Sequence, residues 1–268
     1  MVAAAGADKQ CHVLHAATGQ QAAIGAHDSP VRSVRFVEVP GANGVPIIAS
    51  GSWDKTVRFW DLRQRDALAA VACNNRVFSM DSKARLLVVA TAERHIHLFD
   101  LQNPTSIAKT LESPLRNQTK SVAAFPDGKG WATASIEGRC GINAVDEAEA
   151  SSVNFTFRCH RDPPDLQQDT KVWSVNDVRF HPARDSVFTT AGSDGTFHFW
   201  DRIAHSRLRG YPAVGAPITA TAFNHDGSCF AYAIGYDWSR GCVGNSPSIQ
   251  TQLVLHPVTA EDTSPRRK

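Results

Sequence analysis

Two segments of the chain alternate hydrophobic and polar residues directly after a turn. They are residues 51–61, GSWDKTVRFWD, and residues 192–201, GSDGTFHFWD. An alternation with a period of two is typical of a strand with one buried face. Each run follows an Asp-Lys or Asp-Gly pair, which favours a tight hairpin turn, and we expect Asp54 and Asp194 to occupy the position of positive φ. The pattern therefore predicts antiparallel hairpins.

Weaker copies of the same motif, which ends in Trp-Asp, recur along the chain. The acidic turn residues of the successive copies are Asp8, Asp54, Glu93, Glu137, Asp194 and Asp237. Their intervals of 46, 39, 44, 57 and 43 residues suit the Trp-Asp repeat, in which one four-stranded blade takes about 40 to 45 residues. The longest interval predicts an inserted loop in residues 154–173, where two prolines and a polar run break the pattern. The sequence thus predicts an all-β WD-repeat β-propeller over residues 1–260.

The positions of the copies predict an incomplete ring of blades. The first turn acid, Asp8, follows the start of the chain after little more than one strand. We therefore expect one partial blade, four complete blades and a final blade of three strands, which is five to six blades in all. We also expect that the chain is truncated at its N-terminus, because closed propellers leave no such exposed sheet edges. Residues 261–268 form a basic C-terminal tail.

Charge and hydropathy exclude several classes of protein. The 268 residues include 28 basic and 26 acidic side chains, so binding to nucleic acid would need a local basic patch. The candidate patches are the tail sequence SPRRK and the arginines Arg139, Arg158, Arg161 and Arg240. No segment approaches the ~18 apolar residues of a membrane span, and no secretory signal precedes the first repeat. We expect an intracellular protein without membrane insertion.

The cysteines and histidines form no metal-binding or catalytic motif. The six cysteines are Cys11, Cys73, Cys140, Cys159, Cys229 and Cys242. They lack CxxC spacing, and we interpret them as reduced core residues. Cys159 and His160 would point to opposite faces of an extended chain, so we expect no metal there. The chain also lacks GxSxG, P-loop and HExxH motifs, so we expect neither an enzyme nor a cofactor.

One histidine suggests a structural network. His27 directly precedes an expected inner strand, and we predict hydrogen bonds from it toward Asp54 and Trp60. Asp194 and Trp200 hold the corresponding places in the second strong repeat. We therefore predict that both sets of residues stabilise their own blades.

Several segments outside the strong repeats are distinctive. They include ATAERHIHLFDL at residues 90–101, SIEGR at 135–139, NFTFRCHR at 154–161 and FNHDGSCFAYAIGYDWSRG at 223–241. In this order, and over nearly the whole chain, they resemble the WD-repeat family of messenger-RNA export factors of the nuclear pore. A sibling family, the mitotic-checkpoint propellers, shares SIEGR, the CHR triplet and the GSDG turn. ATAER and FAYAIGYDWSRG favour the export factors.

This resemblance implies a seven-bladed propeller without enzymatic activity that serves as an adaptor in messenger-RNA export. Members of the family bind the GLEBS segment, an acidic peptide motif of a nucleoporin, and they contact RNA. The resemblance implies a location in the nucleus and at the nuclear pore complex of the nuclear envelope, with shuttling to the cytoplasm. The alternative is a spindle-checkpoint scaffold that binds checkpoint kinases at kinetochores, with mitotic spindle or checkpoint proteins as partners.

Five residues are candidates for binding the GLEBS peptide. Arg161 of the CHR triplet and Arg139 of SIEGR flank the long insertion, and arginine can bind a carboxylate through two hydrogen bonds. Trp238, Arg240 and Phe197 form a second group that could hold an apolar side chain beside carboxylates or phosphates. Packing inside a blade is the alternative for the two aromatic residues, and solvation or a local ion pair is the alternative for each arginine. As a loop residue, Arg161 is expected to contribute little to the fold.

Overall fold

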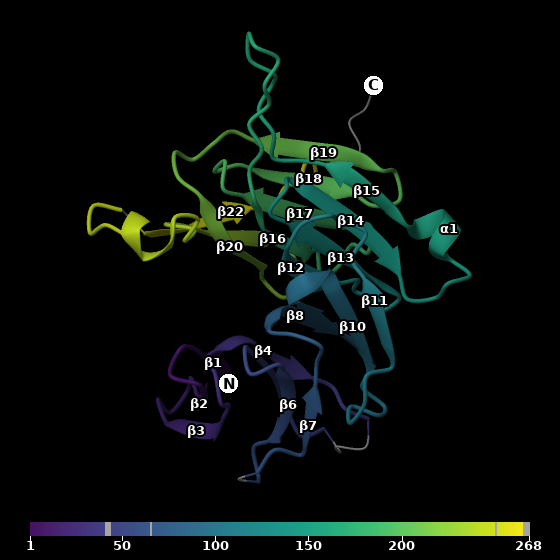
Figure 1. Ribbon diagram of the computed structural model, residues 1–268, viewed down its shortest axis with the longest axis vertical. Coiled ribbons are helices and arrows are strands. Elements are labelled where there is room, and N and C mark those ends of the chain that lie inside the picture. Colours follow the sequence, from purple (N-terminus) through teal and green to yellow (C-terminus); the bar gives the residue numbers. More distant parts are fainter. Residues whose placement is uncertain (41–43, 65, 250, 265–268) are drawn as a thin grey trace. The chain divides into compact units, whose positions relative to one another are not determined.

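The computed structural model describes residues 1–40, 44–64, 66–249 and 251–264, and these residues form mainly strands (Figure 1). Their helical elements are the short helix α1 (Ala150–Val153) and the 3-10 turns η1 (Ala92–Arg94) and η2 (Gly241–Gly244). In the described part of the chain, no helix has the length and apolar character needed to cross a membrane. In sequence order, the six antiparallel sheets contain three, four, four, four, four and three strands. This order confirms the predicted all-β fold and the predicted numbers of strands in successive blades.

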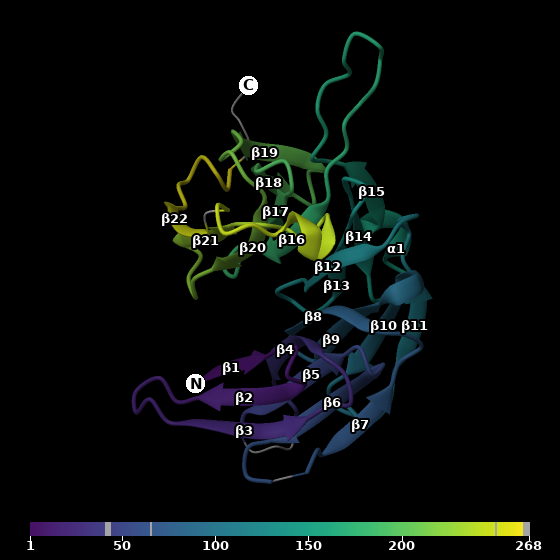
Figure 2. The same ribbon diagram turned by 60° about the vertical axis from the view of Figure 1, so that its left-hand side comes forward.

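The chain divides into two compact units, and the first is Met1–Lys129. Its first sheet, which Figure 2 shows clearly, joins β1 (Val2–Ala5), β2 (Gln10–Leu14) and β3 (Gln21–Ala26). The second joins β4 (Val31–Val37), β5 (Ile47–Ser52), β6 (Thr56–Asp61) and β7 (Ala69–Ala72). The third, in the order β11-β10-β9-β8, contains β8 (Val77–Lys83), β9 (Leu86–Thr91), β10 (His95–Asp100) and β11 (Lys109–Glu112). The last strand of the unit is β12 (Thr119–Ala124).

The second unit is Gly130–Lys268. It begins with the neighbouring strands β13 (Gly130–Ser135), β14 (Arg139–Ala144) and β15 (Phe155–Arg158). The next sheet joins β16 (Val175–Phe180), β17 (Val187–Gly192), β18 (Phe197–Asp201) and β19 (Ser206–Tyr211). The last sheet joins β20 (Ile218–Phe223), β21 (Cys229–Ile234) and β22 (Gln252–Pro257).

Each unit has its own hydrophobic core, made by the alternating strand positions. In the first unit, Val57 and Phe59 of β6 are buried and pack with side chains of β5, β8 and β9, whereas Arg58 between them is half-buried. In the second unit, Phe197 and Phe199 of β18 are buried with Phe230 and Tyr232 of β21. The predicted period-two alternation is therefore confirmed in both strong repeats.

The hairpin turns differ in one detail from the prediction. The positive φ angles lie at Lys55 (68°) and Gly195 (74°), one residue after Asp54 and Asp194. The aspartates instead accept hydrogen bonds: the backbone N–H of Thr56 donates to Asp54 over 2.9 Å, and that of Thr196 donates to Asp194 over 3.0 Å. A carboxylate that binds the backbone two residues later stabilises such a turn. The prediction of positive φ at the aspartates was wrong, because their role is hydrogen bonding.

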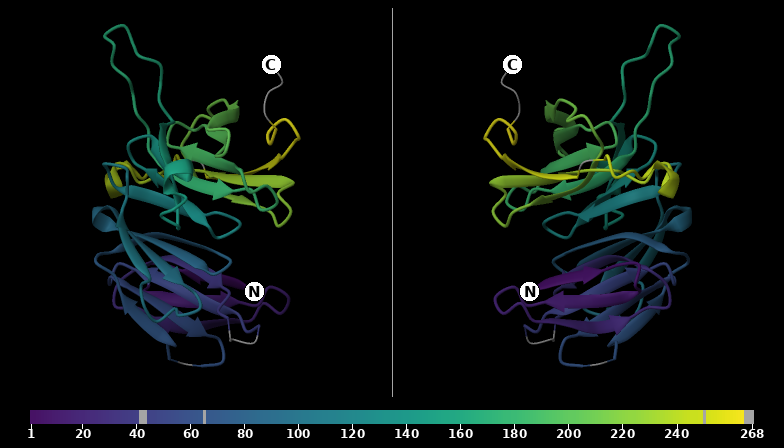
Figure 3. Two further views of the ribbon diagram at one scale, coloured as in Figure 1. Left: turned by 90° about the vertical axis from the view of Figure 1, so that its right-hand side faces the viewer. Right: turned by 90° about the vertical axis from the view of Figure 1, so that its left-hand side faces the viewer.

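The predicted insertion is shorter than expected. Its first residues form strand β15, and Arg161 pairs with Val172 in an isolated β-bridge. The loop proper is therefore residues 162–171, which extends away from the strands of the second unit (Figure 3). Leu166 near its tip is 98% exposed. The break in the hydrophobic pattern indicated a loop, but it did not show where strand β15 ends and the loop begins.

The cysteines and the C-terminal segment also differ from the expectations. Cys11, Cys73, Cys140 and Cys159 are buried, as predicted, but Cys242 in η2 is exposed and Cys229 is half-buried. The predicted tail 261–268 lies outside the described residues from position 265 onward. Asp262 at its start is buried and accepts a hydrogen bond from the Tyr211 hydroxyl over 2.5 Å. The chain is thus packed on the second unit beyond residue 260.

Candidate functional site

A buried histidine, His27, bonds to strand β5 and to the turn between β5 and β6 of the second sheet. His27 follows β3 and is almost fully buried. Its Nδ1 lies 2.8 Å from Asp54 Oδ2, and its Nε2 lies 2.7 Å from the hydroxyl of Ser50. The indole N–H of Trp60 donates to the same hydroxyl over 2.7 Å. Ser50 therefore joins His27 to Trp60, and the buried polar groups satisfy one another.

The second strong repeat contains an equivalent network. His160 Nδ1 lies 2.9 Å from Asp194 Oδ1, and His160 Nε2 lies 2.9 Å from the hydroxyl of Thr190. The indole N–H of Trp200 donates to that hydroxyl over 2.9 Å. Phe157 packs on the Trp200 ring with a centroid distance of 4.6 Å. The network thus holds the segment after β15 against the hairpin β17-β18.

Sequence reasoning missed three members of these networks. Ser50 and Thr190 each lie four residues before the turn aspartate of their repeat, so aligning the two repeats could have revealed the shared hydroxyl. His160 lies 34 residues before its aspartate, whereas the first network's histidine lies 27 residues before its own. The loop 162–171, which follows His160, lengthens the second interval. An inserted loop hides such a partner from any search based on constant spacing.

The two networks carry different charges. Burial alone would raise the pKa of Asp54, yet hydrogen bonds from Thr56, Asp28 and His27 hold it below its usual value. Burial lowers the pKa of His27, despite the nearby Asp54 carboxylate. The guanidinium of Arg58 lies 3.3 Å from that carboxylate and balances its charge. In the first network the positive partner of the aspartate is therefore an arginine.

In the second network, a histidine takes the place of that arginine. His198 lies two residues before Trp200, as Arg58 lies two residues before Trp60. Burial and the nearby His160 lower the pKa of His198 to about 4. Burial would raise the pKa of Asp194, but its hydrogen bond with His160 lowers it below the usual value. At neutral pH, Asp194 is thus ionised beside an uncharged imidazole.

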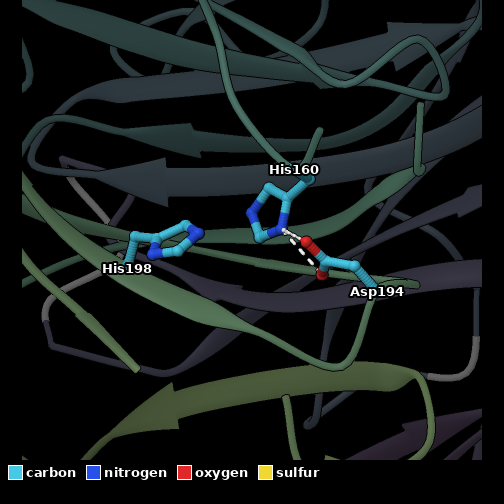
Figure 4. A group of neighbouring side chains, drawn as sticks. All are labelled: His160, Asp194 and His198. Atoms are coloured by element: carbon cyan, nitrogen blue, oxygen red, sulfur yellow. Dashed lines mark hydrogen bonds and ion pairs between the residues drawn. The ribbon is translucent and has the colours of Figure 1, made fainter. Parts of the chain in front are cut away.

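Figure 4 shows the group that results: His160 is hydrogen-bonded to Asp194, and the ring of His198 points toward His160 from the other side. One donor atom from each of the three residues lies within 4.8 Å of the other two. Two histidines and a carboxylate are donors that suit zinc and similar transition metals. The neighbour of His160 in the sequence is Cys159, but the partners of His160 in this group come from the hairpin β17-β18.

The structure places Arg139 and Arg161 beside the turn between β13 and β14. Arg139 opens β14, and its backbone pairs with that of Arg158 on β15. The guanidinium of Arg161 donates to the carbonyl oxygen of Glu137 over 2.8 Å, and both arginines are half-buried. This bond connects the base of the loop to the neighbouring turn, and the small contribution of Arg161 to the core stays a prediction.

The second candidate group does not form as predicted. Trp238 and Arg240 are exposed in the loop between β21 and β22, and Trp238 is 60% exposed. Phe197 is only 2% exposed and stacks on Tyr211 with a centroid distance of 4.5 Å. Phe197 fills the core of the second unit, so it is not a surface partner of the other two. The period-two pattern places Phe197 on one face of its strand, but it does not show whether that face is buried or exposed.

Contacts between neighbouring turns connect the remaining candidates. Asp237, next to Trp238, accepts a hydrogen bond from the hydroxyl of Ser193 over 2.5 Å. The residue after Ser193 is Asp194, which binds His160, the neighbour of Arg161. Arg161, Trp238 and Arg240 therefore lie on loops that meet at the β17-β18 turn. We use the name turn surface for these four residues of neighbouring turns and loops: Arg139, Arg161, Trp238 and Arg240.

Comparison with known proteins supports one family. The family described as "WD domain, G-beta repeat" matches residues 19–61 and 153–201. The mRNA export factor GLE2 of Chaetomium thermophilum is 49% identical over 99% of this chain and 72% of its own length. The Poly(A)+ RNA export protein of Schizosaccharomyces pombe is 49% identical over 100% of this chain and 74% of its own. The WD40 repeat protein poxJ of Penicillium oxalicum is 50% identical over 97% and 74%. The chain therefore belongs to the WD-repeat family of messenger-RNA export factors.

Proposed function

We propose that the chain is a non-enzymatic adaptor of messenger-RNA export that acts at the nuclear pore. In this role it binds an acidic nucleoporin segment of the GLEBS type, and RNA, through the turn surface. Membership of the export-factor family supports the role in export. The proposed location is the nucleus and the nuclear envelope, with movement to the cytoplasm.

The observation that carries the peptide-binding proposal is the exposed Trp238 beside the exposed Arg240. The Trp238 side chain is 60% exposed, and aromatic and arginine side chains are the residues that most often anchor partners. Trp238 has a φ of 60° and its ring lies 5.7 Å from that of Tyr236. The Tyr236 hydroxyl accepts a hydrogen bond from the backbone N–H of Arg240 over 3.0 Å. These contacts give the loop a defined shape before any partner binds.

The arginines of the turn surface provide the acidic partner's counter-charges. Arg139 and Arg161 flank one turn, and Arg240 lies on the loop bound to the next. A peptide lying across these turns would meet the positive charges of the arginines as well as the exposed indole. Phosphates of RNA are recognised by the same side chains, so peptide and RNA are expected to compete for this surface.

The proposal is tested by titrating the full chain with a fluorescent acidic peptide of the nucleoporin GLEBS type. We expect Trp238→Ala and Arg240→Glu each to weaken binding by about tenfold or more, since the loss of an anchor residue costs about 2 kcal/mol. The matched controls are Trp53→Ala and Arg32→Glu, which change an exposed tryptophan and an exposed arginine of the first unit. Equal affinities for all four variants and the unaltered chain would refute the proposed surface.

A second peptide in the same assay distinguishes the sibling role. We expect the nucleoporin segment to bind more tightly than the corresponding segment of a checkpoint kinase. Preferential binding of the kinase segment would instead assign the chain to a spindle-checkpoint scaffold.

A further inference from the structure

The donor atoms around the second network form a compact set. The hydroxyl of Thr196 lies 3.2 Å from His160 Nδ1, 2.8 Å from Asp194 Oδ2 and 3.2 Å from His198 Nε2. His160 Nδ1 also lies 2.9 and 3.0 Å from the two carboxylate oxygens of Asp194. The donors of His160, Asp194 and His198 are within 4.8 Å of one another. Two nitrogens and two oxygens thus lie close together.

These separations approach those of a tetrahedral metal site. Zn²⁺ binds nitrogen and oxygen at about 2.0–2.2 Å, which places its ligands about 3.3–3.6 Å apart in a tetrahedron. The hydrogen-bonded pairs in this set are separated by 2.8 to 3.2 Å and need to move apart by a few tenths of an ångström, whereas any pair of ligand atoms near the 4.8 Å limit needs to move closer together. His198 approaches from β18, and its other ring nitrogen is buried without a hydrogen-bond partner among the described residues. Its ring is therefore not fixed by a second bond.

The first network provides an internal comparison. Thr56 lies in the same relation to His27 and Asp54, at 3.2 and 2.7 Å, but the third side chain there is Arg58. A guanidinium supplies only donor N–H groups and cannot coordinate a cation. The second network replaces it with an imidazole, which has a free lone pair. The two repeats thus differ by the one side chain that decides whether a metal can bind.

We propose that His160, Asp194 and His198 bind a divalent transition metal, best matched by Zn²⁺, with the Thr196 hydroxyl next to the ion. The metal takes Nδ1 of His160, and the ring proton then resides on Nε2. That nitrogen already lies 2.9 Å from the Thr190 hydroxyl, which becomes its acceptor. A histidine ligand held through its second nitrogen is typical of protein metal sites.

The test uses Co²⁺ as a spectroscopic probe and Zn²⁺ as its competitor, both added to the full chain after treatment with a chelator. We expect one equivalent of Co²⁺ to give the visible absorption of a four-coordinate ion, and Zn²⁺ to displace it. His198→Arg reproduces the first network and should abolish this absorption while leaving the circular dichroism spectrum unchanged. His198→Gln, which introduces no charge, should weaken binding by at least tenfold.

The reciprocal variant separates this site from adventitious binding by other histidines. Arg58→His gives the first network the same three donor types, and we expect it to bind a second equivalent of Co²⁺. The proposal is overturned if the unaltered chain gives no four-coordinate absorption, or if His198→Arg and His198→Gln bind Co²⁺ as tightly as the unaltered chain does.

Discussion

Replacing Thr190 by valine tests whether the shared hydroxyl holds the second network together. Valine has nearly the same shape as threonine, so Thr190→Val removes the hydroxyl without opening a cavity. His160 Nε2 and the Trp200 indole N–H, each 2.9 Å from this oxygen, both lose their partner. An unsatisfied buried polar group costs about 1–3 kcal/mol. Because two groups lose their partner, we expect the free energy of unfolding to fall by about 2–6 kcal/mol.

Thr133 of β13 provides a matched control in the same unit. Its side chain is as fully buried as that of Thr190, but its hydroxyl has no hydrogen-bond partner among the described residues. Thr133→Val removes an unpaired polar group, so it should leave stability unchanged or raise it by about 1 kcal/mol. Urea unfolding followed by circular dichroism measures both variants. If the two substitutions change the free energy of unfolding by the same amount, the network does not stabilise the fold as described.

Three further changes have expected outcomes. Burial and the nearby His95 lower the pKa of His97 in the folded chain to about 4, so the unfolded chain binds the additional proton. Stability should therefore fall as pH drops from about 6.5 to about 4, and His97→Gln should weaken this dependence in urea unfolding at pH 7 and 5. Phe197→Ala should lower the free energy of unfolding by about 3–5 kcal/mol in the same assay. The fraction that remains folded should still bind the peptide. Lys55→Gly, at a φ of 68°, should raise the thermal midpoint, because glycine relieves about 1 kcal/mol of backbone strain.

The repeated pattern predicted the fold well because blade formation is local. The alternation around Phe59 and the turn acids every 40 or so residues identified the strands, the hairpins and the order of complete and partial sheets. The burial of Phe197 was less predictable, because its position in the strand does not show which neighbouring sheet covers its side chain. The bond from Arg161 to the Glu137 carbonyl joins segments on either side of β15, and no local pattern records it.

His160 shows why the candidate metal group was not predictable from the sequence. Its partners are Asp194 and His198, which follow it by more than 30 residues, and their meeting depends on the hairpin β17-β18 packing against the segment after β15. A motif search requires ligands at regular spacing, whereas here the fold supplies the proximity. The equivalence of Arg58 and His198 can be read from the two repeats, but the partners that surround each side chain come from the fold.

The exposed loop 162–171 has a practical consequence for handling the protein. Backbone bonds from Asp162 to Lys171 and from Trp173 to His160 close its base, so the peptide bonds beyond them are accessible to a protease. Chymotrypsin should cut first after Leu166. The two fragments should then elute as one species, because His160 remains bound to Asp194 and Phe157 to Trp200 across the break. The same position is therefore suited to a fluorophore, an affinity tag or new chain termini.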